Sequence, residues 1–295
     1  MSESLLFIVG PTASGKTELA LKEATRRGAV ILSCDSLCFY RGMDIGTAKP
    51  TAAERAMVPH YGIDLVEPDE TFSISRYIEY RDEVLSRMKS EGRPVVVAGG
   101  SGFYLKSFFS PVIDRLDVPA EVTKRAEAIR RDEGPDGLIK ALRACNPGGE
   151  TFEGLDLLNP RRVEKALIRC LSSGRGYSQL RQEFLSIPEP LSGYSKEVWL
   201  IDRPISEMQE RNRWRVRKML ESGLIEEVEA LRRQGFERNP SACGAIGYRE
   251  VLEYLLGDVT REHLEELIIT HTNQLMRKQR TWFRRQIPVA REVGS

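Results

Sequence analysis

A glycine-rich turn between an apolar strand and a helix constrains this chain more than any other feature. Residues 5–9 are apolar and lead into Gly10-Pro-Thr-Ala-Ser-Gly15-Lys16-Thr17, after which a helical pattern begins. In the pattern G-x-x-x-x-G-K-[ST], loop N–H groups and the positive end of the next helix surround phosphate oxygens. An ordinary strand–turn–helix is the alternative, but chance seldom places all four fixed residues in this context. The pattern predicts a phosphate site formed by Gly10, Thr12, Ala13, Ser14, Gly15, Lys16 and Thr17.

Within that site, two side chains have the chemistry to act on a phosphate directly. Lys16 supplies a point charge, and the Thr17 hydroxyl is a suitable ligand for a bound Mg²⁺ ion. We therefore expect Mg²⁺ as the cofactor and Thr17 as the residue that contacts it.

The rest of the N-terminal region alternates strands and helices. Three further apolar stretches are typical of buried parallel strands: residues 29–33, 94–98 and 198–201. This order predicts an α/β fold, with a P-loop NTPase-like parallel sheet and helices on both faces. Ligands of such sheets bind at the carboxyl ends of the strands, where the phosphate loop, Asp35 and residues 99–102 would meet.

The character of the chain changes between about residues 110 and 195. This stretch contains seven prolines, short helical patterns such as residues 120–131, and no convincing strand. We expect residues 116–195 to form a helical insertion in a catalytic core made of residues 1–115 and 196–295. The last part of the core has three long amphipathic patterns, which predict helices over residues 205–221, 224–234 and 261–285.

Charge and cysteine usage exclude several classes of protein. The 44 Lys and Arg residues balance 43 Asp and Glu residues, so any surface for a polyanion must be local. Five scattered cysteines without a C-x-x-C pair argue against a disulfide framework and against a zinc site. The first apolar stretch continues into the phosphate loop, which makes it a core strand and not a signal peptide, and no segment could span a bilayer. We expect a cytoplasmic monomer without a membrane partner.

Asp35 directly follows the predicted strand at residues 29–33, which places a carboxylate near the bound phosphates. Such an aspartate commonly holds Mg²⁺ or acts as a base, whereas the alternative is a turn or helix cap. The glycine-punctuated loop at residues 40–50, with Arg41 and Lys49 at its two ends, favours the functional interpretation.

Together these blocks resemble the tRNA dimethylallyltransferases of the bacterial type, over nearly the full length. The most specific block is Tyr40-Arg-Gly-Met-Asp-Ile-Gly-Thr-Ala-Lys-Pro50, and the others are the phosphate loop, Asp35-Ser36, residues 99–104, 159–163, 245–250 and 274–284. The absence of a zinc-finger extension and of an organelle presequence favours the bacterial type. The resemblance implies transfer of a dimethylallyl group from dimethylallyl diphosphate to N6 of the adenine next to the anticodon, at tRNA position 37.

The resemblance also implies roles for individual residues. Lys16, Thr17 and Arg215 would act on the departing diphosphate, and Asp35 would be the general base for the weakly nucleophilic amine. Ser101 matches a family threonine near the target adenine, keeps its hydroxyl, and would be a catalytic residue together with Asp35 and Lys16. Contacts with the tRNA anticodon stem-loop would come from Asp35, Ser36, Leu37, Cys38, Ser101, Arg161, Arg162 and Lys278.

A stacked adenine must flip out to reach Asp35, and Phe39, Tyr40 and Phe103 are candidates to line its channel, with core packing as the alternative. Two features are basic. Residues 270–286 carry five cations and no acid, and Arg161 and Arg162 follow Asn159-Pro160, a typical helix start, where the helix dipole disfavours cations. A phosphate would relieve that repulsion.

Three positions depart from the family pattern, and three other functions stay open. Many members have glutamine at positions 38 and 161 and arginine at position 273, where this chain has Cys38, Arg161 and Asn273. Cys38 lacks an amide that could read a base edge, and Arg161 can hold a phosphate without base specificity.

The alternatives to the proposed tRNA prenyl transfer are a small-molecule P-loop kinase, a prenyltransferase acting on free adenine nucleotides, and an RNA-binding module without catalysis.

Overall fold

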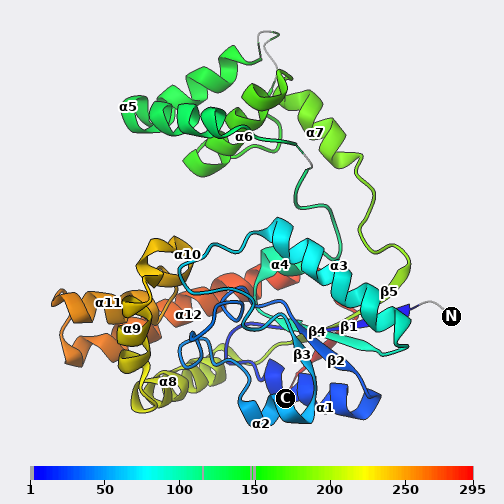
Figure 1. Cartoon of the computed structure of the whole chain (residues 1–295), viewed down its shortest axis with the longest axis vertical. Coiled ribbons are helices and arrows are strands. Elements are labelled where there is room, and N and C mark those ends of the chain that lie inside the picture. Colours follow the sequence, from blue (N-terminus) through cyan, green and yellow to red (C-terminus); the bar gives the residue numbers. More distant parts are fainter. Residues whose placement is uncertain (1–2, 115, 147, 149–150, 295) are drawn as a thin grey trace. The chain divides into compact units, whose positions relative to one another are not determined.

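The computed structural model describes residues 3–114, 116–146, 148 and 151–294. The chain divides into two compact units (Figure 1). The first, which we call the core unit, comprises Met1–Phe109 and Pro190–Ser295, and the second, the insertion unit, comprises Ser110–Glu189.

The core unit contains a six-stranded sheet in the order β3-β2-β4-β1-β5-β6, and every pair of neighbouring strands is parallel. The strands are β1 (Glu3–Val9), β2 (Val30–Ser33), β3 (His60–Tyr61), β4 (Val95–Gly99), β5 (Tyr194–Ile201) and β6 (Arg291–Val293). The α/β class predicted from the sequence is confirmed. Because all strands run the same way, their carboxyl ends share one edge of the sheet. The short strands β3 and β6 were not predicted, since two or three residues carry no readable alternation.

Alternate residues of the strands pack into two separate hydrophobic layers. On one face, Leu6, Ile8 and Val96 pack with the buried alanines of α1 (Lys16–Arg27). On the other face, Phe7, Val97 and their neighbours pack with α3 (Ile74–Ser90) and α4 (Gly102–Lys106). Burial on both faces explains why the sequence of each long strand is almost continuously apolar.

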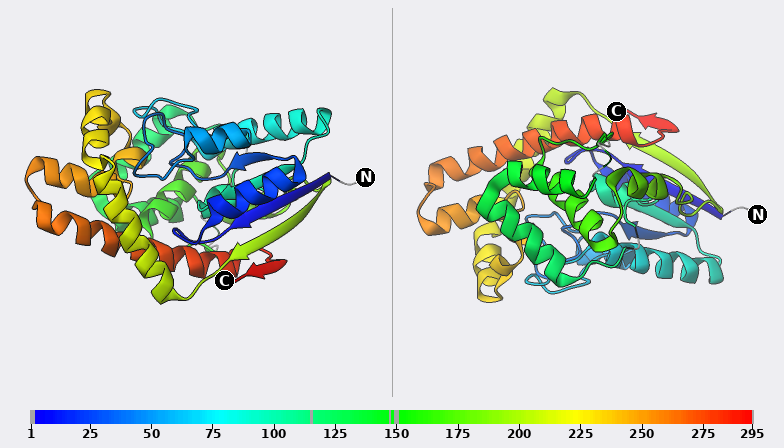
Figure 2. Two further views of the ribbon diagram at one scale, coloured as in Figure 1. Left: turned by 90° about the horizontal axis from the view of Figure 1, so that it is seen from below. Right: turned by 90° about the horizontal axis from the view of Figure 1, so that it is seen from above.

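The C-terminal helices of the core unit extend the second layer. They are α8 (Ile205–Glu221), α9 (Leu224–Arg233), α10 (Pro240–Cys243), α11 (Tyr248–Leu256) and α12 (Arg261–Gln286), with a 3₁₀ turn at Phe236–Arg238. The three long helices agree with their predicted bounds to within one residue. Helices α8 and α12 lie side by side (Figure 2), and Asn212 Nδ2 donates to Asn273 Oδ1 over 3.0 Å between them. A short helix, α2 (Ala52–Met57), follows the loop at residues 40–50.

The insertion unit is helical in the part of it that the structure describes. It contains α5 (Ala120–Ala144), α6 (Pro160–Ser173) and α7 (Tyr177–Leu185) around a small core that includes Leu142 and Leu167. Helix α5 is broken at Gly134, which has a φ of 67° and directly precedes Pro135. The break occurs here because proline has no N–H to donate to the next helical hydrogen bond. Helix α6 begins as predicted: Asn159 is the N-cap and Pro160 the first residue. No helix among the described residues is both long and apolar enough to cross a bilayer.

Candidate active site

The phosphate loop connects β1 to α1 at the carboxyl edge of the sheet. A side chain at Gly10 would collide with β5, since an ideal Cβ there lies 2.6 Å from the carbonyl oxygen of Ile201. Gly15 caps α1 with a φ of +96°, a left-handed conformation that favours glycine. The N–H groups that open a helix have no acceptor within it, so the start of α1 offers donors to an anion.

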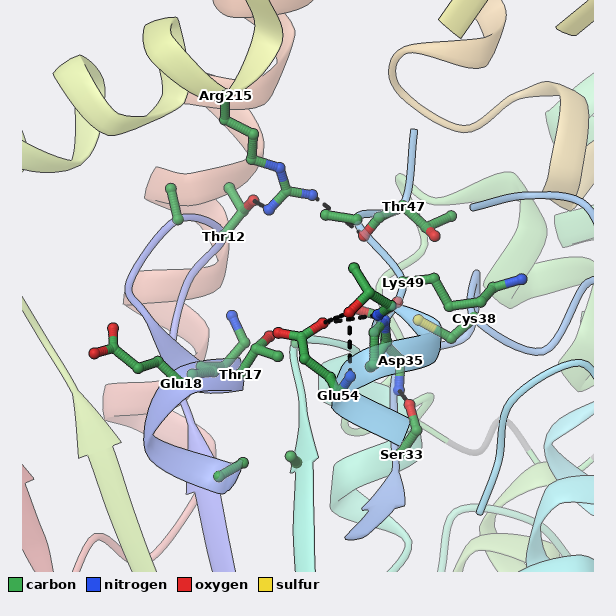
Figure 3. Close-up of a pocket in the computed structure, with 18 of the residues that line it drawn as sticks. Thr12, Thr17, Glu18, Ser33, Asp35, Cys38, Thr47, Lys49, Glu54 and Arg215 are labelled. Carbon is green, nitrogen blue, oxygen red and sulfur yellow. Dashed lines mark hydrogen bonds between the residues drawn. The ribbon is translucent and has the colours of Figure 1, made fainter. Parts of the chain in front are cut away.

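A cavity of about 1710 Å³ lies against this loop. Its walls include the phosphate loop, the ends of β2 and β4 with Asp35 and Cys38 after β2, the loop at residues 44–50, and helices α2, α8 and α12 (Figure 3). Of the predicted phosphate residues, Thr12, Ala13, Gly15, Lys16 and Thr17 line the cavity. Gly10 and Ser14 are not in the lining. Ser14 is fully buried, and its hydroxyl lacks a hydrogen-bond partner among the described residues.

Lys16 and Arg215 bring two cations to the cavity wall. Lys16 Nζ donates to the carbonyl oxygen of Pro11 over 2.6 Å. Arg215 NH1 donates to Thr12 Oγ1 over 3.1 Å, and its NH2 donates to the carbonyl oxygen of Thr47 over 3.3 Å. Neither cation has a carboxylate ion-pair partner in the described part of the chain. Two cations that meet only neutral oxygens suit a bound anion.

Burial lowers the pKa of Lys16 to about 8, while the negative charge of Asp35 opposes this shift and the charge of Arg215 adds to it. The pKa of the Arg215 guanidinium is also lowered by burial, and Asp35 again acts in the opposite direction. Both side chains are therefore cations at neutral pH, and both feel the carboxylate of Asp35.

Asp35 faces the cavity from the end of β2, as predicted. Its Oδ1 accepts a hydrogen bond from the backbone N–H of Leu37 over 3.3 Å, and its own N–H donates to Ser33 Oγ over 3.3 Å. Its Oδ2 lies 3.8 Å from the ideal Cβ position of Gly100, at the end of β4. These distances place the carboxylate between the ends of two neighbouring strands.

The predicted tRNA-binding residues beside Asp35 lie in three different surroundings. Ser36 and Ser101 join the ends of β2 and β4: the Ser36 N–H donates to Ser101 Oγ over 3.0 Å, and the two hydroxyl oxygens are 3.1 Å apart. Cys38 lines the cavity, and burial raises the pKa of its thiol, which keeps it neutral. Leu37 packs partly buried against the hydrophobic core.

Two of the three aromatic candidates for the channel, Phe39 and Tyr40, are core residues. Phe39 is fully buried and Tyr40 is 3% exposed. The Phe39 ring packs against Tyr77 with centroids 5.3 Å apart, so it belongs to the core beneath the site. Phe103, by contrast, is 53% exposed. Core packing was the alternative, and it holds for two of the three rings.

Three residues that the sequence analysis did not assign to the phosphate site contact the phosphate loop in the structure. Arg211 Nε donates to the carbonyl oxygen of Ala13 over 2.8 Å, and Arg203 Nε donates to that of Ser14 over 2.9 Å. Gln279 accepts from the Thr12 N–H over 2.8 Å and donates to the Gly100 carbonyl over 3.0 Å. Arg211 was detectable, because it lies four residues before Arg215 on the same face of α8.

The basic segment at residues 270–286 is less cationic than its sequence predicts. Arg280 and Arg284 both pair with Asp202, which follows β5, and Arg280 Nε lies 2.8 Å from its carboxylate. Lys278 is exposed on the same helix. On the insertion unit, Arg161 and Arg162 are exposed in the first turn of α6, which carries no acidic residue.

The residues of the site fit a metal ion that is held mainly by the phosphate oxygens of a bound diphosphate and by water. No group of three or more His, Cys, Asp or Glu residues that could hold a metal ion exists among the described residues. Thr17 is exposed in the cavity lining, next to the helix start. Mg²⁺ commonly takes one or two protein ligands and completes its shell with phosphate oxygens and water, so a Thr17 hydroxyl and a diphosphate are compatible with it.

Comparison with known proteins identifies the family. The model of the IPP transferase family matches residues 38–286. This chain belongs to the IPP transferase family. A protein of Opitutus terrae named tRNA dimethylallyltransferase is 45% identical over 291 residues, which cover 99% of this chain and 93% of the relative. One of Bdellovibrio bacteriovorus with the same name is 37% identical, over 95% and 90% of the two chains.

The fold also matches a solved member of the family. The structure is similar to the full-length tRNA isopentenylpyrophosphate transferase of Bacillus halodurans, with a TM-score of 0.70 and 30% identity. The match covers 99% of this chain and 90% of the solved one. The resemblance inferred from the sequence blocks is thereby confirmed.

Proposed function

We propose that this protein transfers the dimethylallyl group of dimethylallyl diphosphate to N6 of the adenine at tRNA position 37, on the 3′ side of the anticodon. One observation carries the proposal: the cations Lys16 and Arg215 and the carboxylate of Asp35 line the same cavity, at the carboxyl edge of the sheet. The names of the family relatives support the same activity.

Each part of the reaction has a residue suited to it. The N6 nitrogen attacks the first carbon of the dimethylallyl group, and the carbon–oxygen bond breaks with its electron pair passing to the diphosphate. Asp35 accepts the proton that N6 loses. Lys16 and Arg215 offset the negative charge that grows on the leaving oxygen, where a fixed charge lowers the barrier most.

Binding of diphosphate requires both cations to exchange partners. Lys16 would leave the carbonyl oxygen of Pro11, and Arg215 would leave the Thr12 hydroxyl but keep the Thr47 carbonyl, in favour of phosphate oxygens. A cation binds an anionic phosphate oxygen more strongly than a neutral carbonyl or hydroxyl oxygen, so the exchange is favourable. The N–H groups of residues 15–17 at the start of α1 complete the anion site.

The Thr17 hydroxyl would hold Mg²⁺ together with oxygens of the diphosphate. A bound Mg²⁺ would neutralise part of the charge on the leaving group. Gly10 allows the loop to pass close to β5, and the Ser14 side chain is buried beneath the loop. Neither residue therefore offers a side-chain contact to the diphosphate.

The acceptor is proposed to be an anticodon stem-loop. The adenine would flip out of its stack to reach Asp35, beside the Ser36–Ser101 pair and Cys38. Arg161, Arg162 and Lys278 are exposed and would hold backbone phosphates, with the insertion unit gripping the stem-loop. A single nucleotide would leave these cations without a role. We further propose that the protein acts as a monomer in the cytoplasm.

Product analysis separates this function from its alternatives. The protein is incubated with dimethylallyl diphosphate and either an anticodon stem-loop with adenine at position 37 or AMP. The stem-loop should gain one dimethylallyl group on N6 for each diphosphate released, and AMP should react far more slowly. Added ATP should remain intact. Equal reaction of AMP would assign the free-nucleotide activity, and transfer of the γ-phosphate of ATP would assign a kinase.

A further inference from the structure

The loop at residues 44–50 forms one wall of the cavity and contacts Arg215, one of its two cations. The Thr47 carbonyl oxygen accepts from Arg215 NH2, while Arg215 NH1 reaches Thr12 in the phosphate loop. The guanidinium therefore bridges two walls of the cavity. Where Thr47 lies decides where this cation lies.

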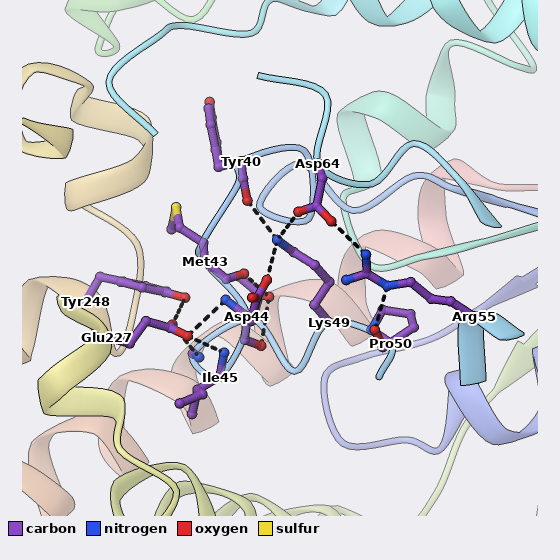
Figure 4. A network of polar contacts seen from close by, with 12 residues as sticks. Tyr40, Met43, Asp44, Ile45, Lys49, Pro50, Arg55, Asp64, Glu227 and Tyr248 are labelled. Atoms are coloured by element: carbon purple, nitrogen blue, oxygen red, sulfur yellow. Dashed lines mark hydrogen bonds and ion pairs between the residues drawn. The ribbon is translucent and has the colours of Figure 1, made fainter. Parts of the chain in front are cut away.

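A carboxylate from outside the cavity holds the backbone just before Thr47. Glu227 on α9 accepts three successive backbone N–H groups, from Asp44 over 3.1 Å, Ile45 over 2.7 Å and Gly46 over 3.2 Å (Figure 4). Glu227 is not part of the cavity lining. Consecutive N–H groups that converge in this way make an anion site, and here the anion belongs to the protein itself.

Tyr248 at the start of α11 completes this arrangement. Its hydroxyl donates to Glu227 Oε1 over 2.7 Å. The tyrosine is fully buried, and burial raises its pKa well above the usual value, with the charge of Glu227 adding to the shift, so it stays a donor. Its ring covers Gly46 so closely that an ideal Cβ there would lie 2.5 Å from the ring. Glycine is needed at this position because of that contact.

The other end of the loop is fastened separately. Lys49 has a fully buried side chain, which contacts Asp44 and Asp64 at 2.7 Å each and donates to the Tyr40 carbonyl oxygen. Inside the loop, the Thr47 hydroxyl donates to the Met43 carbonyl oxygen over 2.7 Å. With Lys49 held in place, a displacement of residues 44–46 would also move Thr47.

We infer that Glu227 is a positioning residue for prenyl transfer: with Tyr248, it fixes residues 44–46 so that the Thr47 carbonyl aims Arg215 at the departing diphosphate. The inference rests on the proposed function for its chemistry, but its geometry concerns only the diphosphate site. Glu227 touches no substrate in this account and acts through Arg215.

A double-mutant cycle tests the inference with inorganic diphosphate as the probe. Glu227→Gln keeps the shape of the side chain but leaves one loop N–H facing an amide donor. Diphosphate binding should weaken by about ten-fold, the worth of one charge-assisted hydrogen bond. The matched control is Glu229→Gln, an exposed residue of the same helix with the same change of charge, which should leave binding unchanged.

The Arg215→Ala background distinguishes positioning from general destabilisation. There Glu227→Gln should change diphosphate affinity by less than about two-fold, because the cation that it positions is gone. The single-turnover rate of prenyl transfer should follow the same pattern. A ten-fold loss in both backgrounds, or no loss in either, would overturn the inference.

Tyr248→Phe keeps the ring over Gly46 and removes one donor to Glu227, so it covers the case in which Glu227→Gln does not fold. It should weaken diphosphate binding by about three-fold, and only when Arg215 is present. Unchanged affinity in this variant would also contradict the inference. If the unmodified protein binds diphosphate but transfers no prenyl group, the proposed function fails while the cycle still decides the role of Glu227.

Discussion

Lys16 and Arg215 in the cavity can be compared with Arg161 and Arg162 at the start of α6, since both pairs are proposed to bind phosphate. The cavity pair is partly buried, contacts only neutral oxygens, and has its pKa values lowered by burial. The α6 pair is exposed, at the positive end of a helix. Charges in a low-dielectric site act strongly over short distances, whereas exposed charges are screened by salt.

This difference indicates a division of labour. The cavity has the environment in which a cation changes the rate of bond breaking, because its field is fixed and unscreened. The exposed cations have the environment of phosphate contacts that add affinity without chemistry. Four variants or conditions test this division, and the one with the largest expected effect comes first.

Asp35→Asn should have the largest effect, since it removes the proton acceptor and keeps the shape of the side chain. Turnover should fall by about two to four orders of magnitude, while tRNA affinity stays within a few-fold. Single-turnover prenylation and tRNA binding measure the two quantities. Asp258→Asn, at an exposed position, is the control and should behave as the unmodified protein does. Near-normal turnover of Asp35→Asn would remove the residue from the role of base.

Lys16→Ala should lower kcat by about two to three orders of magnitude, because it removes a charge that stabilises the leaving group mainly in the transition state. Lys22→Ala is the matched control, since Lys22 lies on the same helix and is exposed. If Lys16→Ala raises KM for dimethylallyl diphosphate and leaves kcat intact, the residue binds ground state and transition state equally. The leaving-group role would then be wrong.

The pH dependence of the reaction should report Lys16. Its pKa of about 8 means that the cation dominates below this pH and is lost as the pH rises through it. Accordingly kcat/KM for dimethylallyl diphosphate should fall about ten-fold per pH unit well above pH 8. Lys16→Arg should remove this alkaline limb, since the guanidinium stays protonated. A limb that persists in Lys16→Arg belongs to another group.

Replacing Arg161 and Arg162 together by Ala should have the smallest effect on catalysis and a clear effect on the salt dependence of binding. The slope of log K for the stem-loop against log salt should become shallower by about one to two phosphate contacts. Titrations at several salt concentrations measure it. An unchanged slope would show that these arginines do not contact the backbone of the RNA.

The sequence predicted the parts of the site that depend on local pattern. The phosphate loop and Asp35 each follow a readable apolar strand, and parallel strands bring their ends to one edge, so their meeting was predictable. Arg203 follows β5 at that same edge and could have been found by the same argument. The long helices α8, α9 and α12 were predicted nearly to the residue, because their apolar periodicity extends over many turns.

The contacts that could not be predicted join distant segments through side chains. Glu227 accepts a hydrogen bond from the N–H of Ile45, which lies 182 positions away in the sequence. No pattern in either segment predicts this contact. The burial of Phe39 and Tyr40 likewise depends on what packs around them, since an aromatic residue after a strand suits a core as well as a channel. Asp202, at the end of β5, pairs with Arg280 and Arg284 and so neutralises part of the positive charge of α12. This pairing cannot be predicted from the sequence of the helix alone.

The most direct test of the division between cavity and surface is the single-turnover rate of prenyl transfer at saturating stem-loop. Saturation restores whatever was lost in affinity and leaves what was lost in chemistry. The Arg161→Ala, Arg162→Ala double variant should react within about two-fold of the unmodified rate, whereas Lys16→Ala should stay slower by about two to three orders of magnitude. A double variant that remains slow at saturation would contradict the account, because surface cations would then take part in the chemistry.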